Sequence, residues 1–359
     1  MTAIAGNPLD RHDVHERVRK ALSTFLSAQL PRLDAVSDEL GPVHDALAEF
    51  LLDGGKRLRP AFCFWGWRAA GGEDSDEIVT AAACLELLHA CALIHDDVMD
   101  GSDTRRGRPA VHRRFATLHR GNGWQGDGEG FGRSAAILLG DLCLIWADEM
   151  LVTSGLPAES LVRGQRVYDR MRVELRAGQY LDLLEQVLGG PSIARALRVA
   201  RYKSAKYTIE GPLHLGAVLA GAGPDVLASF TAYGVPLGEA FQLRDDVLGV
   251  FGDPAETGKP AGDDLREGKR TALVAAAAER ANPRQAAVLR RHLGDPRLDP
   301  TGVTALREVI TQTGALADVE CMIAQRTDEA RTALAMAPIT EEARIVLGEL
   351  SVTATTRRL

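Results

Sequence analysis

Two acidic clusters are the parts of the sequence best suited to chemistry. The first reads His95-Asp-Asp-Val-Met-Asp100, and the second contains the pair Asp245-Asp246. In a helix, residues four apart share a face, so Asp96 and Asp100 are expected to project side by side. Adjacent carboxylates repel unless a cation lies between them, and hard oxygen ligands suit Mg²⁺, which prefers a few carboxylates plus water and phosphate. The alternative is a solvated acidic helix end.

Cationic residues accompany both clusters. Arg105 and Arg106 follow the first one, and Asp53-Gly-Gly-Lys-Arg-Leu-Arg-Pro60 places further cations just before a helix. Glycines let the backbone approach a ligand closely, and the N–H groups at the start of a helix add a positive end. This loop is either a second phosphate site or an ordinary basic turn, and the motif by itself does not decide between the two.

Cations also lie around the second cluster. Lys203 and Lys206 are expected in a helix, with one of them facing a cavity, and the loop 251–271, rich in glycine, proline and charge, carries Lys259 and Lys269. Asp141, Gln179 and Asp182 are either partners for such cations or satisfied polar groups of the core.

Helices must position these groups. The first cluster ends a helix expected from near Asp76, about 25 residues long, which is apolar on every side from Ile78 to Ile94 and should therefore be enclosed by other helices. The second cluster is expected on a helix beginning near Pro236. Amphipathic patterns predict helices at 12–36 and 43–52, and apolar patterns predict helices at 134–146 and 171–186. Alanine-rich packing helices are expected at 272–350. Six glycines between 121 and 132 predict a mobile loop.

Composition favours an all-α protein, with 45% hydrophobic and 5% aromatic residues among 359. Since no long polar linker divides residues 37–350, we expect a single domain over residues 1–359. A formal charge of −7 argues against nucleic acid as a partner. No uninterrupted apolar run predicts a membrane span, and the N-terminus lacks the pattern of a secretory signal, so a cytoplasmic location is expected. The five cysteines lack paired spacing and are expected to be buried thiols.

Five motifs occur in the order found in trans-isoprenyl diphosphate synthases, and the chain resembles that family over about residues 45–275. More closely, it resembles the actinobacterial geranylgeranyl diphosphate synthases. The motifs are Gly54-Gly-Lys-Arg-Leu-Arg-Pro60, His95-Asp-Asp-Val-Met-Asp100 with Arg105-Arg106, Lys203-Ser204, Phe241-Gln-Leu-Arg-Asp-Asp246 and Gly258-Lys-Pro260.

The resemblance implies a single large helical bundle around a deep central apolar cavity, usually in a homodimer, that joins isopentenyl diphosphate to dimethylallyl, geranyl or farnesyl diphosphate with two or three Mg²⁺ ions. By position, Asp96, Asp100 and Asp245 match the metal ligands. Lys56, Arg59, His89 and Arg106 match the isopentenyl diphosphate site. Arg105, Lys203, Gln242 and Lys259 match the contacts of the allylic diphosphate. The residues expected to act in catalysis are Asp96, Asp100, Arg105, Lys203, Asp245 and Lys259.

The chain departs from the family pattern at two positions. Gly249 replaces the usual third aspartate of the second motif and removes a carboxylate, which concerns the third metal ion. Ser204 replaces a threonine and keeps the hydroxyl. Activity is still expected, because the first aspartate of that motif generally does most of the metal binding in the family.

The residues before Asp96 bear on product length. Cys91 and Ala92 are small, where farnesyl-producing relatives usually have an aromatic residue, so we expect a deeper tunnel and a C20 product, with Trp146 as one possible floor. The alternatives are another chain length, a terpene cyclase, a metal phosphohydrolase suggested by His95-Asp96, and a non-catalytic partner subunit suggested by Gly249.

Overall fold

The computed structural model describes residues 8–188, 190–253 and 262–355. The protein is 80% helical, and the two short strands of one hairpin are the only strands among the described residues. The chain forms two compact units, Met1–Gly164 with Leu215–Gly221 (unit 1) and Gln165–His214 with Ala222–Leu359 (unit 2). The single domain expected over residues 1–359 remains a prediction.

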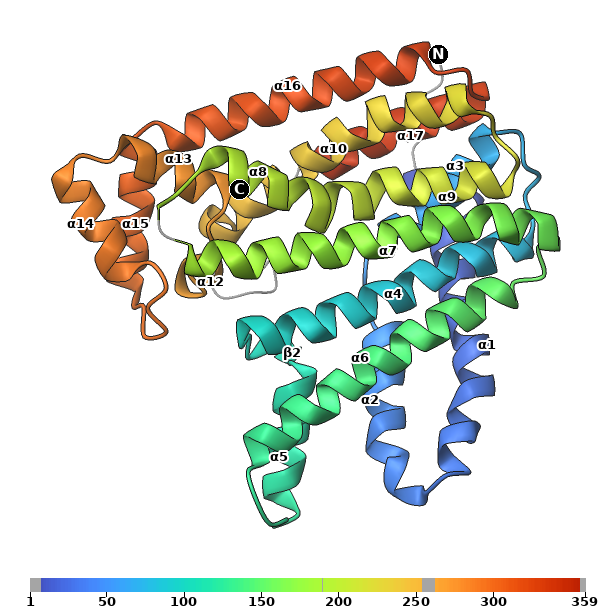
Figure 1. Ribbon diagram of the computed structural model, residues 1–359, viewed down its shortest axis with the longest axis horizontal. Coiled ribbons are helices and arrows are strands. Elements are labelled where there is room, and N and C mark those ends of the chain that lie inside the picture. Colours follow the sequence, from blue (N-terminus) through green and yellow to red (C-terminus); the bar gives the residue numbers. More distant parts are fainter. Residues whose placement is uncertain (1–7, 189, 254–261, 356–359) are drawn as a thin grey trace. The chain divides into compact units, whose positions relative to one another are not determined.

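Unit 1 contains the N-terminal helices and the first acidic cluster (Figure 1). Its elements are η1 (Pro8–Asp13), α1 (Val14–Asp34), η2 (Asp38–Leu40), α2 (Gly41–Leu52), α3 (Leu58–Ala69), α4 (Asp76–Asp100), β1 (Thr104–Arg105), β2 (Arg108–Pro109), α5 (Val111–Gly121) and α6 (Gly128–Val152). The helices expected at 12–36 and 43–52 are confirmed by α1 and α2.

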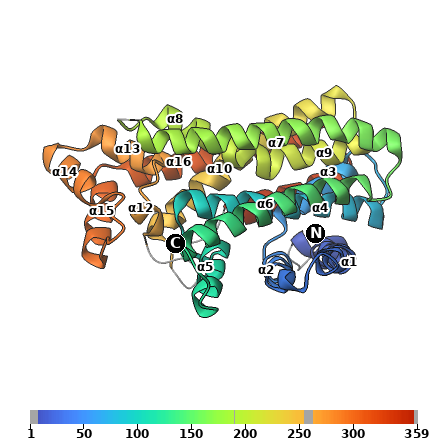
Figure 2. The same ribbon diagram turned by 60° about the horizontal axis from the view of Figure 1, so that its bottom comes forward.

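Helix α4 is the core of unit 1. It packs against α1, α3 and α6, and α6 runs beside it in both ribbon views (Figures 1 and 2). Its side chains are buried on every side from Ile78 to Cys91, so the expectation of an enclosed helix starting at Asp76 is confirmed. An 18-residue window of α4 is also apolar enough to cross a membrane, with a mean hydropathy of 1.8, but 72% of that window is buried in the protein, as expected for a core helix.

The glycine-rich segment is more helical than its composition suggested. The expectation of a loop over 121–132 is wrong at both ends, since α5 ends at Gly121 and α6 begins at Gly128. Asp127 caps α6 by accepting a hydrogen bond from the Glu129 N–H at 3.0 Å. A Cβ at Gly132 would lie 2.2 Å from the His112 carbonyl oxygen, so this glycine permits close packing of α6 on α5.

Unit 2 carries the second acidic cluster and the C-terminal helices. Its elements are most of α7 (Ala158–Val187), α8 (Ile193–Val199), the π-helix η3 (Ala200–Glu210), the start of α9 (Gly211–Leu219), α10 (Pro224–Phe251), α12 (Asp263–Arg266), α13 (Ala272–Arg280), α14 (Pro283–His292), α15 (Pro300–Gln312), α16 (Ala315–Met336) and α17 (Glu341–Thr355). The alanine-rich packing helices expected at 272–350 are confirmed.

Helix α10 is the long helix of unit 2, and it begins twelve residues before the expected start at Pro236. The expectation was wrong because Pro236 lies inside the helix, where a proline usually marks an end. A Cβ at Gly238 would lie 2.5 Å from the Ala205 Cα, and one at Gly234 would lie 3.0 Å from the Glu210 Cα. These two glycines let α10 pack closely against η3.

A second apolar core holds α10 to the C-terminal helices. Leu243, Val247 and Val250 of α10 are buried with side chains of α12, α13, α15 and α16. Arg244 adds a two-point ion pair with Glu320, with nitrogen–oxygen distances of 2.6 and 2.7 Å. One face of α10 is thus used for this apolar core, and Asp245 lies on the face opposite to Leu243 and Val247.

Candidate active site

The first acidic cluster lies at the C-terminal end of α4. The helix ends at Gly101, whose φ of 66° is the left-handed conformation that glycine adopts readily. Asp96 and Asp100 are one helical turn apart before this end, as the sequence predicts. Only 14% of the Asp96 side chain is exposed, and its carboxylate lies 3.8 Å from the Arg105 guanidinium.

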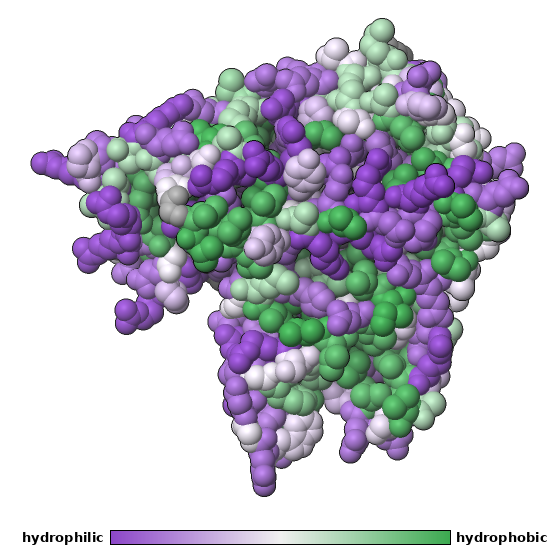
Figure 3. All heavy atoms as spheres, in the orientation of Figure 1, coloured by the Kyte–Doolittle hydropathy of each residue, from purple (hydrophilic) through white to green (hydrophobic). Residues whose placement is uncertain are grey.

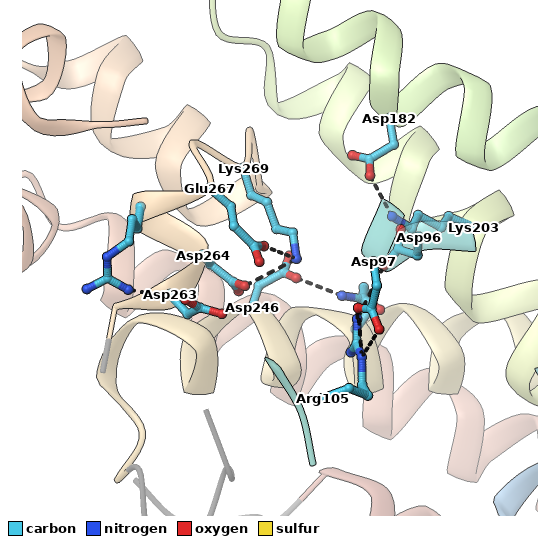
Figure 4. Close-up of polar contacts among 12 residues, drawn as sticks. Asp96, Asp97, Arg105, Asp182, Lys203, Asp246, Asp263, Asp264, Glu267 and Lys269 are labelled. Carbon is cyan, nitrogen blue, oxygen red and sulfur yellow. Dashed lines mark hydrogen bonds and ion pairs between the residues drawn. The ribbon is translucent and has the colours of Figure 1, made fainter. Parts of the chain in front are cut away.

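Asp97 is a residue that sequence analysis missed. Its side chain is 1% exposed and accepts hydrogen bonds from Arg105, whose Nε lies 3.0 Å from Oδ1 and 3.3 Å from Oδ2 (Figure 4). Asp97 thus fixes Arg105 beside Asp96. The sequence did contain a signal, because Asp97 directly follows Asp96. Adjacent residues of a helix point about 100° apart, so Asp97 faces a different neighbour from Asp96.

A short hairpin places the two arginines. Thr104 pairs with Pro109 and Arg105 with Arg108, leaving a two-residue turn in which Arg106 and Gly107 have φ values of 53° and 74°. Positive φ at both turn residues matches the right-handed twist of the strands. The two side chains therefore point in different directions. Arg105 contacts Asp97 of α4, and Arg106 lies near the Asp53 carbonyl oxygen in the loop before α3.

That loop carries the predicted isopentenyl diphosphate cations. Lys56 is exposed and Arg59 is half-buried in the first turn of α3. Arg57, which the sequence suggested as a third cation for phosphate, is instead 4% exposed, and its guanidinium pairs with Glu86 of α4 at 2.6 Å. Arg57 therefore anchors the loop to the core.

His89 lies among the cations of this loop and hairpin. Burial, followed by the charges of Arg59, Arg106, Arg105 and Arg57, holds the pKa of His89 well below its usual value. Burial and the other arginines also lower the pKa of Arg106. The structure thus brings together three of the four residues expected at the isopentenyl site, His89, Arg59 and Arg106, in an electropositive environment suited to an anion.

The second cluster, on α10, is partly buried. Gln242 donates a hydrogen bond to the Asp246 carboxylate at 2.7 Å, and Asp246 is 7% exposed, whereas Asp245 is more accessible. Burial raises the pKa of Asp246 to about 8, and the charges of Asp264 and Asp245 act in the same direction. The Asp246 carboxyl is therefore expected to be protonated near neutral pH when no cation is bound.

Lys203 is held by the π-helix η3. Its Nζ lies 2.6 Å from an Asp182 carboxylate oxygen of α7, which shows that Asp182 is a partner for a cation. A Cβ at Gly178 would lie 2.4 Å from the Lys203 backbone nitrogen, so this glycine allows the close approach of η3 to α7. Lys206 pairs with Glu210 at 2.8 Å and with Glu174 at 3.3 Å, and thus has a structural role.

Acidic and basic side chains of the segment after α10 lie beside this second cluster. Lys269 lies 2.7 Å from Glu267 and 3.4 Å from Asp264, and Figure 4 shows these three groups beside Asp246. Lys259, expected to contact the allylic diphosphate, lies outside the described residues with the rest of its Gly-Lys-Pro motif. The predicted site residues Lys203, Gln242 and Asp245 belong to unit 2, and the other described ones belong to unit 1.

The donor chemistry fits magnesium better than a transition metal. Over the described ranges, no three histidine, cysteine, aspartate or glutamate side chains are grouped as a complete metal site. Mg²⁺ is commonly held by one or two carboxylates, with water and substrate phosphate completing its shell. Asp96 and Asp100, one turn apart beside a guanidinium, form such an incomplete set of hard oxygen ligands. A metal phosphohydrolase is disfavoured, because His95 Nε2 lies 3.0 Å from the Ile137 carbonyl oxygen and so joins α4 to α6.

Solved structures show the same fold. The chain is 44% identical to a geranylgeranyl pyrophosphate synthase from Corynebacterium glutamicum, whose crystal structure is complexed with isoprenyl diphosphate and magnesium. The two superpose with a TM-score of 0.93 over 96% of this chain and 99% of the other. This similarity and the helical content confirm the all-α isoprenoid synthase fold.

Curated relatives agree. The chain is 34% identical over 289 residues to a geranylfarnesyl diphosphate synthase of Aeropyrum pernix, covering 79% of this chain and 84% of the relative. It is 38% identical over 224 residues to a geranylgeranyl diphosphate synthase of Mycobacterium tuberculosis, covering 62% of this chain and 58% of that protein. The kinship with actinobacterial enzymes is thereby confirmed.

The family model for polyprenyl synthetase matches residues 42–310, which include all five motifs. The expectation of a prenyl-transferring enzyme that binds isoprenyl diphosphates is therefore confirmed. The chain belongs to the polyprenyl synthetase family and is a trans-prenyl diphosphate synthase.

Proposed function

We propose that this enzyme condenses isopentenyl diphosphate with an allylic diphosphate (dimethylallyl, geranyl or farnesyl) to give geranylgeranyl diphosphate. The observation that carries the proposal is the neutral His89 among arginines, close to the loop of Lys56 and Arg59. This cationic site is separate in function from the carboxylates of Asp96 and Asp100. One site suits a diphosphate bound directly and the other a diphosphate bound through metal, as a two-substrate condensation requires.

Enzymes of this family use a divalent metal ion. We propose two or three Mg²⁺ ions, held by Asp96, Asp100 and Asp245. Bound magnesium supplies positive charge to the oxygens of the leaving diphosphate. In this chain the carboxylates hold and orient that charge, and Asp97 restrains Arg105 beside them.

The cations assist ionisation of the allylic substrate. Breaking the allylic C–O bond leaves a carbocation and a diphosphate, and fixed positive groups stabilise the developing negative charge. We assign this role to Arg105, Lys203 and Lys259. Lys203 is already held in place by Asp182 at 2.6 Å, which limits the reorganisation needed during the reaction.

The isopentenyl site positions the second reactant. Lys56, Arg59 and Arg106 bind its diphosphate, and neutral His89 can donate a hydrogen bond to it without adding a further charge. The isopentenyl double bond then attacks the cation, forming the new C–C bond. Loss of a proton restores a double bond, and the released diphosphate is the proposed base.

Small residues before Asp96 favour a long product. Cys91 is fully buried, and its Sγ lies 3.8 Å from His95 Nδ1. Ala92 is about one turn from Asp96. Neither side chain is bulky enough to act as the aromatic block of farnesyl-producing relatives. Trp146 is buried against Phe25, with ring centroids 6.3 Å apart, and remains our candidate for the floor of the tunnel.

Product sizing tests the chain length. Purified enzyme with Mg²⁺, labelled isopentenyl diphosphate and each of the three allylic primers should give a labelled C20 diphosphate. Cys91→Phe and Ala92→Phe should shorten the product, whereas Cys321→Phe, at an exposed cysteine of α16, should leave it unchanged. Unchanged length in both α4 variants would refute the assignment, and unlabelled hydrocarbons would indicate a terpene cyclase instead.

A homodimer is proposed from the surface of α6. Ile137, Leu138 and Ile145 are 47%, 67% and 60% exposed and recur at helical spacing on this helix. Figure 3 shows hydrophobic surface gathered in the part of the view that α6 occupies. An apolar face of this kind suits burial against a second copy of the chain. A cytoplasmic location is also proposed, which cell fractionation tests.

A further inference from the structure

Gly249 stands where the second acidic motif would have a third carboxylate, and the structure shows what occupies that space. A Cβ at Gly249 would lie 1.9 Å from Asp264 Oδ2 and 2.6 Å from Asp264 Cγ. Contacts this short do not occur between real atoms, so the carboxylate of Asp264 fills the volume where a side chain at 249 would begin. Position 249 is one helical turn after Asp245 and therefore on its face of α10.

We propose that Asp264 supplies from α12 the carboxylate that α10 lacks at Gly249, and that it acts with Asp245 toward the divalent metal bound with diphosphate. This inference rests on the proposed function. It also explains why a chain without the third aspartate is a working synthase and not a non-catalytic subunit, since the motif is completed by another element.

The backbone of α12 is well fixed for this role. Leu265 is 1% exposed and belongs to the same apolar core as Leu243 and Val247 of α10. Its carbonyl oxygen accepts a hydrogen bond from the Gly294 N–H at 2.9 Å, and the Asp264 carbonyl accepts one from Lys269 at 3.0 Å. The residue that carries the carboxylate is thus anchored on both sides.

Nearby charges are compatible with a carboxylate at this place. Lys269 Nζ lies 3.4 Å from Asp264 Oδ1, and it also pairs with Glu267 (Figure 4). Its positive charge offsets part of the repulsion between Asp264 and the aspartates of α10. Only 14% of the Asp264 side chain and 20% of that of Lys269 are exposed, so solvent screens this pair incompletely.

The Asp264 carboxylate occupies the space of a side chain at position 249. The proposal can therefore be tested by removing the carboxylate from position 264 and placing one at position 249. The variants are Asp264→Ala, Gly249→Asp and the double variant. The matched control is Asp263→Ala, which removes the neighbouring carboxylate that pairs with Arg266 at 3.2 Å. Mn²⁺ binding in the presence of inorganic pyrophosphate is measured by electron paramagnetic resonance, and the Mg²⁺ dependence of turnover is measured separately.

Asp264→Ala should weaken Mn²⁺ binding by about 10- to 100-fold, the usual effect of losing a group that supports a metal site, and the control should not. The double variant should recover most of this loss, whereas Gly249→Asp alone should be impaired by crowding. Normal Mn²⁺ binding by Asp264→Ala, or a double variant no better than the single one, would overturn the inference. If Asp264→Ala fails to fold by circular dichroism, Asp264→Asn, which keeps the shape, decides in its place.

The two hypotheses fail in different ways. A wild-type enzyme that binds Mn²⁺ with pyrophosphate but incorporates no isopentenyl diphosphate would defeat the proposed function. An active wild type whose Asp264 and Asp263 variants have the same Mg²⁺ dependence would defeat only the role of Asp264.

Discussion

At the scale of single residues, spacing predicted which acidic side chains share a helix face, but it did not predict the partners of those side chains. The four-residue interval between Asp96 and Asp100 is a property of the helix itself, so it could be recognised in the sequence. The contact of Asp97 with Arg105 and that of Asp264 with Gly249 could not, because tertiary packing brings these residues together. Arg57 was misjudged for the same reason, since only the fold places buried Glu86 opposite it.

His89 gives a prediction for the pH dependence of stability. Its pKa in the folded protein is depressed, so as the pH falls below about 6.5 the unfolded chain binds a proton that the folded chain does not. Stability contributed by the neutral imidazole is therefore present above that pH and lost below it. His89→Gln should flatten the fall in unfolding free energy between pH 6.5 and 5.5, by at most about 1.4 kcal/mol.

Guanidinium unfolding at each pH measures this effect. His44→Gln, at a position of α2 where 36% of the side chain is exposed, is the control for the simple loss of a histidine. Equal slopes for the wild type and His89→Gln, or the same flattening in both variants, would show that burial of His89 among arginines does not govern the acid response.

At the scale of elements, periodicity predicted most helices but missed those that depend on close contacts. Helix α6 begins at Gly128 because an aspartate caps it and a glycine lets it approach α5, which a count of glycines does not reveal. The π-helix η3 was expected only as a helical context around Lys203. Its geometry depends on packing against α7 and α10 through glycines of those helices.

A substitution at Gly178 tests whether the close approach of η3 to α7 positions Lys203. Gly178→Ala places a methyl group 2.4 Å from a backbone nitrogen, so η3 must shift, at a cost of about 1–3 kcal/mol. The variant should melt at lower temperature and show a raised KM for the allylic diphosphate. Gly348→Ala in α17 is the control, because its new methyl group meets only Leu334 at 3.9 Å and should not destabilise the protein. Similar melting of both alanine variants would contradict the close-approach argument.

At the scale of the whole molecule, the all-α class followed from composition, and the family followed from the order of five motifs. The division into two compact units did not, because contact density depends on the fold and no linker in the sequence marks the boundary. Association of chains was likewise only implied by resemblance, and the exposed apolar face of α6 gives it a physical basis.

The α6 face predicts the assembly state. Leu138 is 67% exposed, so Leu138→Glu should not disturb the core, yet it would bury a charge in a dimer interface. Sedimentation should show a dimer for the wild type and a shift toward monomer for the variant. Val352→Glu, on exposed surface of α17, should leave the dimer intact. A wild-type monomer, or a Leu138→Glu dimer of unchanged stability, would exclude this interface.

The central claim is that the acidic clusters of α4 and α10 serve one prenyl-transfer step, and single-turnover incorporation of labelled isopentenyl diphosphate tests it most directly. With farnesyl diphosphate as the primer, one turnover of the wild type should add a single C5 unit and form a C20 diphosphate. Asp96→Asn and Asp245→Asn should each slow the chemical step by about 10²- to 10³-fold, and the double variant should fall well short of the product of the two losses. Incorporation by either single variant at the wild-type rate, or losses that simply multiply, would contradict the account.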